Sequence, residues 1–196
     1  LYSELQCSEA IRKAVERMGF AEMTEIQEKT IPVMLAGHDV IAKAPTGTGK
    51  TCAFGIPVAE HIQPENKYPQ AVIMAPTREL AQQIAEELSN LTYFMPEVQV
   101  ACVYGGANME KQAKRLAEGC QIVVATPGRL MDHYKHHSID ISHVTQIVLD
   151  EADEMLNMGF YKDVRHIIEM MKARKALSMF SATISREVMD IGWMYQ

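Results

Sequence analysis

Six short β-like runs alternate with helical segments along this chain, and that alternation constrains its fold more than any other feature. The runs are residues 39–43, 71–75, 98–103, 121–125, 146–149 and 176–180. Strands separated by helices pair in parallel, because each helix returns the chain to the same end of the sheet. The sequence therefore predicts an α/β domain with a predominantly parallel sheet and helices on both faces.

Polar motifs come directly after these runs rather than before them. They occupy residues 46–51, 76–79, 105–106, 126–129, 150–153 and 181–183. The carboxyl ends of parallel strands lie at one edge of a sheet, and such folds bind their ligands there. We therefore expect the six motifs to gather along a single edge.

Residues 44–51, APTGTGKT, have the features of a phosphate-binding loop between a strand and a helix. Such a loop needs glycines that let backbone N–H groups face a polyphosphate, a lysine that reaches the outer phosphates, and a hydroxyl that ligates Mg²⁺. The helix that follows adds the positive end of its dipole. The residues that supply these parts are Thr46, Gly47, Thr48, Gly49, Lys50 and Thr51. Ala44 replaces the usual first glycine, and the alternative is a turn that merely links strand to helix.

Two carboxylates, Asp150 and Glu151, directly follow the buried run that ends at Leu149. An NTPase of this kind needs one carboxylate to hold Mg²⁺ and a second group to orient the attacking water. We assign Asp150, together with Thr51, to the metal and Glu151 to the water, while Lys50 holds the phosphates. The alternative is an acidic first turn that stabilises a helix dipole.

Two helix starts are indicated near the beginning of the chain. Ser8 can cap a helix that stops at Gly19 and whose apolar stripe consists of Ile11, Ala14, Val15 and Met18. Thr24 and Gln27 have the spacing of a capping box, in which each side chain bonds the backbone of the other residue. From periodicity alone, this structural role for Gln27 is favoured over contact with a ligand.

Size and charge bound the class of protein. The chain has 196 residues, 47% of them apolar, which suffices for the core of one domain. Its 19 Lys and Arg against 25 Asp and Glu give a net charge of −6, which disfavours an extensively basic nucleic-acid binder. A local patch of a few arginines and helix N-termini can still hold a phosphate backbone.

The apolar runs are far too short to span a bilayer, so we expect no membrane segment. The chain begins at Leu1 with no basic-then-apolar leader, and we expect no secretory signal. The four cysteines, which form no CxxC pair and fit reduced thiols in a cytoplasmic protein, are Cys7, Cys52, Cys102 and Cys120. The group formed by His133, His136 and His137 is interpreted as a solvated helix end rather than a metal site.

In order and spacing, the motifs resemble the first RecA-like domain of DEAD-box ATP-dependent RNA helicases. The resemblance rests on residues 44–51, 76–81, 126–129, the Asp-Glu-Ala-Asp at 150–153, and 181–183, and covers essentially the whole chain. It implies a RecA-like P-loop NTPase fold over residues 1–196 as a single ATP-binding domain, with the second RecA-like domain absent. ATP and Mg²⁺ are the implied cofactors, and single-stranded RNA is the implied partner.

The same family has a Gln-containing adenine-recognition motif, which here falls within residues 1–28. The positions that match it are Gly19, Phe20, Thr24, Ile26 and Gln27, whereas Met23 stands where the family usually has proline. Tyr2, seventeen residues before Gly19, stands where an aromatic ring, usually Phe, stacks on adenine. The resemblance reverses the weighting for Gln27, because its amide can pair with the N6 and N7 edge of adenine. The residues thus expected at the base are Tyr2, Phe20, Thr24 and Gln27.

The resemblance also implies an RNA-binding set and a coupling set. The RNA-binding set is Pro76, Thr77, Arg78, Gly105, Gly106, Thr126, Pro127, Gly128 and Arg129. Helix N-termini and arginines read phosphates rather than bases, so we expect weak sequence preference; three ordinary helix starts and a turn are the alternative. Asp153, Ser181 and Thr183 would couple the ATP state to RNA handling, although a hydroxyl pair at a strand end is more often a helix cap.

The function that follows is the ATP-binding half of an RNA helicase, able to unwind short duplexes only with its second domain. An ATP-dependent RNA clamp with little turnover is the main alternative, and the retained Glu151 argues against it. A P-loop kinase or transport ATPase is a third class, which the motifs at residues 76–79, 126–129 and 181–183 do not suit.

Overall fold

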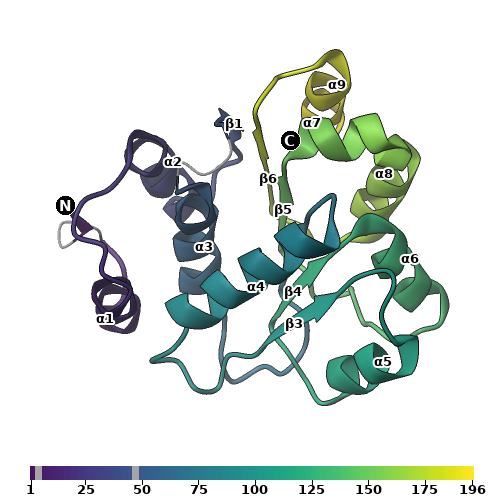
Figure 1. The fold of residues 1–196 in the computed structure, drawn as a ribbon, viewed down its shortest axis with the longest axis horizontal. Helices are drawn as coiled ribbons and strands as arrows, with labels where there is room; N and C mark the ends of the chain where they lie inside the picture. Colours follow the sequence, from purple (N-terminus) through teal and green to yellow (C-terminus); the bar gives the residue numbers. More distant parts are fainter. Residues whose placement is uncertain (3–5, 46–48) are drawn as a thin grey trace.

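A computed structural model of the chain describes residues 1–2, 6–45 and 49–196, and in these it contains one six-stranded sheet (Figure 1). The strand order is β1-β6-β5-β2-β4-β3, and every neighbouring pair is parallel. The strands are β1 (Ile41–Lys43), β2 (Ala71–Met74), β3 (Val100–Val103), β4 (Ile122–Ala125), β5 (Gln146–Asp150) and β6 (Ala176–Ser181). The predicted parallel α/β architecture is confirmed.

The observed strands differ from the predicted runs by at most two residues at either end. β1 and β3 begin two residues later than predicted, at Ile41 and Val100. β5 and β6 each extend one residue further, to Asp150 and Ser181, because Asp150 still pairs with Phe180. The first acidic residue of the motif is therefore the last residue of a strand.

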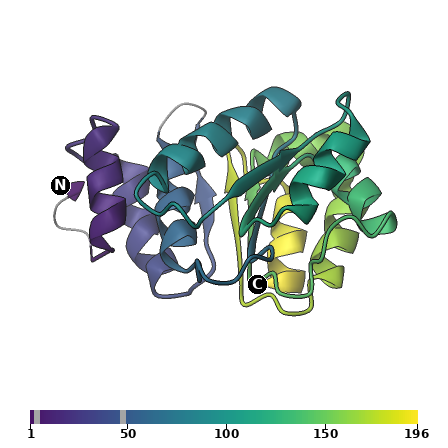
Figure 2. The same cartoon turned by 90° about the horizontal axis from the view of Figure 1, so that it is seen from below.

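Two layers of helices enclose the sheet, as the view from below shows (Figure 2). One layer packs on the sheet face that carries Ile73, and it contains α1 (Glu9–Arg17), α2 (Glu25–Leu35), α3 (Lys50–Glu60) and α4 (Arg78–Leu91). The other packs on the face that carries Val72 and Met74, and it contains α5 (Met109–Ala117), α6 (Pro127–Lys135), α7 (Ala152–Met155), α8 (Tyr161–Met170) and α9 (Arg186–Tyr195). Alternate residues of a strand point to opposite faces, so β2 is apolar throughout.

The helix starts follow the predicted capping chemistry. The Ser8 and Thr77 side chains accept hydrogen bonds from backbone N–H groups in the first turns of α1 and α4. Thr126 precedes Pro127 at the first position of α6, where the missing N–H of proline costs nothing. The buried residues of α1, Ile11, Ala14 and Val15, lie on the predicted stripe.

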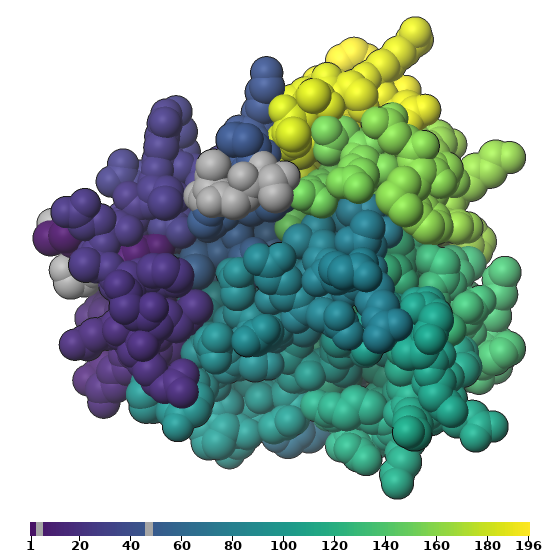
Figure 3. Space-filling model, viewed as in Figure 1, coloured from purple at the N-terminus to yellow at the C-terminus, as the bar shows by residue number. Residues whose placement is uncertain are grey.

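A kinked segment, η2 (Leu156–Phe160), joins α7 to α8, and Gly159 at φ +92° interrupts the helical backbone there. The segment around α4 lies between the N-terminal helices and the C-terminal part of the molecule in the space-filling view (Figure 3). Within the described ranges, we find no helix with the length and apolar character needed to cross a bilayer.

Candidate active site

The carboxyl ends of the six strands form one edge of the sheet, which we call the motif rim. Its strand-end residues are Lys43, Met74, Val103, Ala125, Asp150 and Ser181. Because all pairs are parallel, each polar motif that follows a strand lies along this edge, as predicted. Thr46, Gly47 and Thr48 belong to the predicted phosphate loop but lie outside the described residues.

Lys50 joins the phosphate loop to the acidic motif. Its Nζ lies 3.0 Å from Asp150 Oδ1 and 3.5 Å from Glu151 Oε1. Lys50 is the first residue of α3 and Asp150 the last of β5, so a helix start and a strand end hold this cluster. Lys50 is 5% exposed and Asp150 is fully buried. A buried lysine between two carboxylates is strongly held and has its charge balanced in place.

Asp150 has one oxygen committed to protein and one oriented for a ligand. Its Oδ1 accepts hydrogen bonds from Lys50 and from the Glu151 backbone N–H, at 2.9 Å. Its Oδ2 is buried and has no hydrogen-bond partner among the described residues. Burial raises the pKa of Asp150, and the Lys50 ammonium acts against that rise. An orphaned carboxylate oxygen suits a hard cation, so the site fits the implied Mg²⁺.

The Thr51 hydroxyl, predicted as the second metal ligand, is buried on the first turn of α3. It hydrogen-bonds Glu87, a half-buried carboxyl on α4 that also lies in the field of Asp150. Burial raises the pKa of Glu87, and the Thr51 hydrogen bond opposes this. A carboxyl group that no motif indicated therefore lies beside the residues predicted to hold the metal.

Glu151, the residue assigned to the attacking water, has an unusual backbone. Its φ of 49° and ψ of 52° place it in the left-handed region, at the N-cap of α7. A residue other than glycine adopts this conformation only where its surroundings enforce it, and such positions concentrate at functional sites. Its side chain is 16% exposed, on the solvent side of Lys50 and Asp150.

The Gln27 amide is both a cap and a tie to the phosphate loop. Its Oε1 accepts from the Thr24 backbone N–H at 3.1 Å and from the Tyr2 hydroxyl, and its Nε2 donates to the Gly49 carbonyl at 2.9 Å. The Gln27 backbone N–H donates to Thr24 Oγ1 at 3.4 Å, so the predicted capping box is confirmed. A Cβ at Gly49, where φ is +75°, would lie 2.7 Å from the Gln27 nitrogen. Both the positive φ and this close contact therefore require glycine at position 49.

The two aromatic residues expected at the base lie together. The rings of Tyr2 and Phe20 have centroids 6.2 Å apart and are stacked, with Tyr2 buried and Phe20 exposed. Burial raises the pKa of Tyr2, and its hydroxyl is held by Gln27. The two rings line a hollow of about 400 Å³, and a separate hollow of about 430 Å³ is lined by the first turn of α2 and by Ala44 and Pro45.

The acidic motif is bonded directly to the end of β6. Thr183 Oγ1 and the Thr183 N–H donate to Asp153 Oδ2 at 2.7 and 3.1 Å. The Asp153 N–H donates to Ser181 Oγ at 3.1 Å, and that hydroxyl donates to the Thr183 carbonyl at 2.6 Å. The cap of α9 is Ser185 instead. The capping alternative for Ser181 and Thr183 is therefore wrong, and their contact with the acidic motif is present.

Arg78 and the glycine pair lie at the end of β3. The Arg78 guanidinium lies over the Tyr104 ring, 4.9 Å from its centroid. Gly106 has a φ of +82°, and a Cβ there would approach Arg78 Nη1 to 3.9 Å. Gly105 and Gly106 are exposed, so backbone and guanidinium share one open surface.

Arg129 points inward rather than to the open rim. Its Nη1 donates to the Ala107 carbonyl and to Gln112 Oε1, both at 3.0 Å, and its side chain is only 13% exposed. Gln112 Nε2 in turn donates to the Tyr104 carbonyl at 3.0 Å. The guanidinium therefore ties α6 to the loop that carries Gly105 and Gly106. Thr126, Pro127 and Gly128 form the start of the same helix.

His133 corrects one prediction. We placed it at a solvated helix end, but it is fully buried, and its Nε2 lies 3.1 Å from Gln112 Oε1. Both His133 Nε2 and Arg129 Nη1 must donate to that oxygen, which assigns the Nε2–H tautomer. His136 and His137 are exposed, as predicted. In the described part of the chain, no three His, Cys, Asp or Glu side chains are grouped to hold a metal.

A family model described as DEAD/DEAH box helicase matches residues 24–191. This chain belongs to the DEAD/DEAH box helicase family. The ATP-dependent RNA helicase CshA of Limosilactobacillus reuteri is 49% identical over 191 residues, which are 97% of this chain and 38% of that protein. The DEAD-box ATP-dependent RNA helicase CshA of Geobacillus kaustophilus is 47% identical over 183 residues, which are 93% of this chain and 39% of that protein. The chain thus spans little more than a third of these relatives.

Solved structures of DEAD-box proteins share the fold. A DEAD box protein from the hyperthermophile Methanococcus jannaschii superposes with a TM-score of 0.91 at 40% identity, covering 99% of this chain and 53% of that one. The yeast DEAD-box splicing factor Prp28 superposes with a TM-score of 0.90 at 34% identity, covering 97% of this chain and 48% of that one. The RecA-like fold that we predicted is confirmed.

Three polar side chains of this DEAD/DEAH box domain contact predicted site residues but belong to no motif. Glu87 bonds Thr51, Gln112 bonds Arg129, and Tyr104 lies under Arg78. Gln112 and Glu87 occupy the inward side of amphipathic helices, where periodicity predicts an apolar residue. A polar residue at a core position of a helix was the available signal, because such a group needs a partner.

Proposed function

We propose that this chain is the ATP-binding and Mg²⁺-dependent ATP-hydrolysing domain of an RNA helicase. It binds the backbone of single-stranded RNA without sequence specificity and unwinds short duplexes together with a second RecA-like domain. The contact of Lys50 with Asp150 and Glu151 carries this proposal, because it brings a phosphate-binding cation and two carboxylates to one point of the rim. The printed names of the relatives agree, and we place the protein in the cytoplasm.

In this proposal each residue of the cluster has a separate task. Lys50 leaves its carboxylate partners for the outer phosphates, while N–H groups at the start of α3 face the same anion. Asp150 and Thr51 would hold Mg²⁺, and the ion would supply positive charge close to the phosphates. Glu151 accepts a hydrogen bond from the attacking water and orients it. Gln27, Tyr2, Phe20 and Thr24 bind the adenine.

RNA binding is assigned to the part of the rim that follows β2, β3 and β4. The N-termini of α4 and α6 supply backbone donors, and Arg78 supplies a charge. Gly105 and Gly106 let a strand approach the backbone closely. The Asp153 bonds to Ser181 and Thr183 connect the acidic motif to β6, which supports a coupling role. These groups contact phosphate and sugar, so base identity has little influence.

The test uses two substitutions in the full-length parent protein. Lys50→Ala removes the phosphate ligand, so ATP affinity should fall by at least tenfold. Glu151→Gln keeps the shape and removes the acceptor charge, so ATP affinity should persist while hydrolysis falls by about 10² or more. Glu118→Gln, an exposed carboxyl at the end of α5, is the matched control. Turnover of Glu151→Gln at the parent rate would contradict the assignment of the water.

An ATP-dependent RNA clamp with little turnover is the second candidate. Both functions use the same binding residues, and they differ in whether RNA accelerates hydrolysis. Single-stranded RNA should raise the steady-state ATPase rate of the full-length parent. RNA retention with ATP but without any rise in hydrolysis would favour the clamp.

A further inference from the structure

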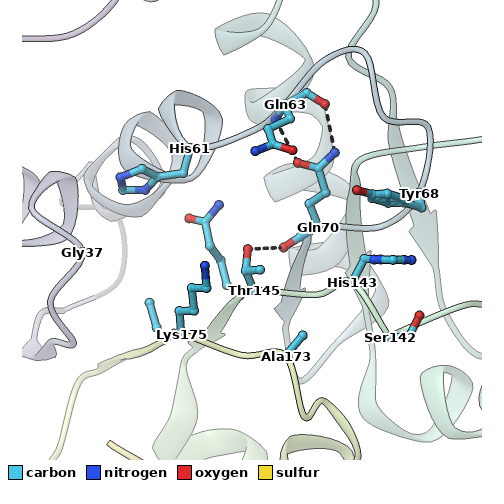
Figure 4. Close-up of a pocket in the computed structure, with 12 residues that line it drawn as sticks. Gly37, His61, Gln63, Tyr68, Gln70, Ser142, His143, Thr145, Ala173 and Lys175 are labelled. Carbon is cyan, nitrogen blue, oxygen red and sulfur yellow. Dashed lines mark hydrogen bonds between the residues drawn. The ribbon is translucent and has the colours of Figure 1, made fainter.

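A hollow of about 590 Å³ lies at the edge of the sheet opposite the motif rim, where β2, β5 and β6 begin (Figure 4). We call it the basal hollow and define it by His61, Gln63, Tyr68, His143, Gln146 and Lys175. Its walls come from the loop between α3 and β2 and from the residues just before β5 and β6. The nucleotide site lies at the other ends of the same strands, so the basal hollow is a separate feature.

Most acceptor groups around the basal hollow already accept hydrogen bonds from other residues of the protein. Gln70 Oε1 accepts from the Gln63 N–H at 2.9 Å, and its Nε2 donates to the Gln63 and Asn66 carbonyls at 2.9 and 3.0 Å. Gln63 Oε1 accepts from Asn66 Nδ2 at 2.8 Å. Among the described residues, the Gln63 amide nitrogen and the Tyr68 hydroxyl have no hydrogen-bond partner. The surface therefore presents more donors than acceptors.

Lys175 adds a positive charge that the rest of the structure does not neutralise. Its side chain points into the hollow, while Tyr68 and His143 lie face to face on the other side (Figure 4). Among the described residues, its ammonium group has no ion pair and no hydrogen bond, and the residue is exposed. The residues that line the hollow in this described part include no Asp or Glu. An anion is the ligand that this combination favours.

Two nearby carboxylates, Asp140 and Asp39, already accept hydrogen bonds from other residues of the protein. Asp140 accepts hydrogen bonds from the Ser142 N–H and hydroxyl, at 2.9 and 2.6 Å, and these bonds lower its pKa. Asp39 Oδ1 accepts from the Leu177 N–H at 2.8 Å. Hydrogen bonds do not remove the charge of a carboxylate, so the case for an anion here rests on the exposed lysines Lys172 and Lys175.

A second hollow, of about 260 Å³, shares Lys175 with the first and adds Lys172, Arg174 and the carboxylate Asp39. The Arg174 guanidinium is engaged with the Ile168 and Met171 carbonyls. Lys172 is exposed, so two lysines three residues apart face solvent along one edge. A small anion can contact only one of these two lysines at a time, whereas a linear polyanion can contact both.

An aromatic surface lies across the basal hollow from Lys175 (Figure 4). Tyr68 and His143 stack with their centroids 4.0 Å apart and 20° between their planes. Bases of single-stranded nucleic acid stack on such rings while nearby lysines bind the phosphates. We propose that the basal hollow binds single-stranded RNA, with phosphates on Lys172 and Lys175 and a base on the Tyr68 and His143 pair. The choice of RNA as ligand rests on the proposed function.

The first test measures the salt dependence of oligouridine binding by the full-length parent. Each phosphate contact of a single strand contributes about 0.7 to the slope of log K against log salt. The Lys172→Ala, Lys175→Ala double variant should have a slope smaller by about 1.4. Its deficit in affinity should therefore shrink about sevenfold between about 50 and 200 mM salt. The Lys13→Ala, Lys29→Ala double variant, which changes net charge equally on exposed faces of α1 and α2, should keep the parent slope.

The second test locates the RNA. Photocrosslinking of 5-iodouridine oligomers should label Tyr68 or His143, and the label should persist in an Arg78→Ala variant, in which the rim is impaired. An unchanged salt slope together with no label at either residue would overturn the inference. Loss of RNA affinity in Arg78→Ala would then still support the proposed function. If Arg78→Ala kept full RNA affinity while the basal label persisted, RNA binding at the rim would fail instead.

Discussion

Gln27 has a side chain shared by three neighbours, and this makes its role separable by substitution. Its Oε1 serves the capping box and Tyr2, whereas its Nε2 serves Gly49. An amide nitrogen has two hydrogens, so a second one is left for an acceptor such as adenine N7. The capping box and contact with a base therefore use different atoms of one amide.

We predict that Gln27→Glu separates the two roles. Glutamate at this position keeps the oxygen that the Thr24 N–H needs but sets a buried acceptor against the Gly49 carbonyl, so unfolding free energy should fall by about 1–3 kcal/mol. The donor toward adenine is lost, so the preference for ADP over GDP should fall by about tenfold. Calorimetric titration with both nucleotides measures this. Gln27→Ala should lose both the cap and the preference. An unchanged ratio in both variants would leave Gln27 as a cap alone.

His133 makes stability depend on pH. Burial, followed by the charge of Arg129, lowers its pKa, while Asp132 opposes and His136 adds to the fall. The unfolded chain therefore takes up a proton near pH 6.5 that the folded protein does not. The free energy of unfolding should rise with pH up to about 6.5 and should be partly lost as the pH falls below that value.

The measurement is the free energy of unfolding between about pH 5 and 7, the range that spans the ordinary pKa of histidine. His133→Gln keeps a donor for Gln112 and cannot titrate, so its stability should fall less on acidification than that of the parent. His38→Gln, at an exposed histidine, should keep the parent's dependence. If the free energy of unfolding of His133→Gln had the same pH dependence as that of the parent, groups other than His133 would cause the acid sensitivity.

Individual residues show which features of the site the sequence could predict and which it could not. Lys50, Asp150 and Glu151 were predicted because their tasks require those residue types at strand ends and helix starts. His133 was misplaced because the polar neighbours of α6 hid its partner, Gln112, which lies 21 residues earlier on another helix. Side-chain partners across elements have no fixed spacing, so local patterns do not reveal them.

At the scale of secondary-structure elements, Gln112 connects three of them: α5, α6 and the end of β3. Through its amide, α5 holds α6 at Arg129 and His133 and holds the end of β3 at Tyr104. Tyr104 also accepts a hydrogen bond from Gln82 on α4 at 3.0 Å and lies under Arg78. The helices that carry the proposed RNA-binding residues are therefore tied together through one buried amide.

We predict that Gln112→Leu weakens RNA binding by about tenfold or more while ADP affinity stays within about twofold. Loss of the Gln112 amide leaves the buried donors of Arg129 and His133 without an acceptor, so the free energy of unfolding should also fall by about 2–4 kcal/mol. Arg129→Ala should weaken RNA binding, and the double variant should weaken it no further. Gln112→Glu, which keeps the acceptor, should retain most affinity. Gln83→Leu, at an exposed residue of α4, is the control.

The boundaries of β2 and β4 were predictable because each of these two strands is a continuous apolar run. β2 and β4 are buried at every position, and their runs stop at polar motifs. β5 extended to Asp150 because its backbone keeps pairing although its side chain is charged. The kink at Leu156–Phe160 was not predicted, since its cause is the left-handed Gly159 within an otherwise helical pattern.

At the scale of the molecule, the two edges of the sheet carry different groups. Every polar motif follows a strand, so the motif rim was predictable as a whole from the order of elements. The basal hollow was not, because its residues come from four segments that share no motif and no spacing. The charge of the whole chain concealed its local excess of lysines.

The arginines of this domain have positions that bear on catalysis. Arg78 lies over Tyr104, and Arg129 bonds Ala107 and Gln112, so both serve the rim beside β3 and β4. Arg186 is the first residue of α9, beyond the bonds of Thr183 to Asp153. Phosphoryl transfer in related NTPases relies on an arginine finger that approaches the outer phosphate. In our proposal, the second RecA-like domain supplies it.

We therefore predict that residues 1–196 alone hydrolyse ATP very poorly and do not separate RNA duplexes. An arginine finger contributes about 10³ to 10⁵ in rate, which equals about 4–7 kcal/mol of transition-state stabilisation. Unwinding also needs two surfaces that close on one strand. The measurement is RNA-stimulated ATPase and duplex separation with this domain, before and after the second domain is added in trans. Turnover by the domain alone at the rate of its full-length parent would show that residues 1–196 contain the whole catalytic site.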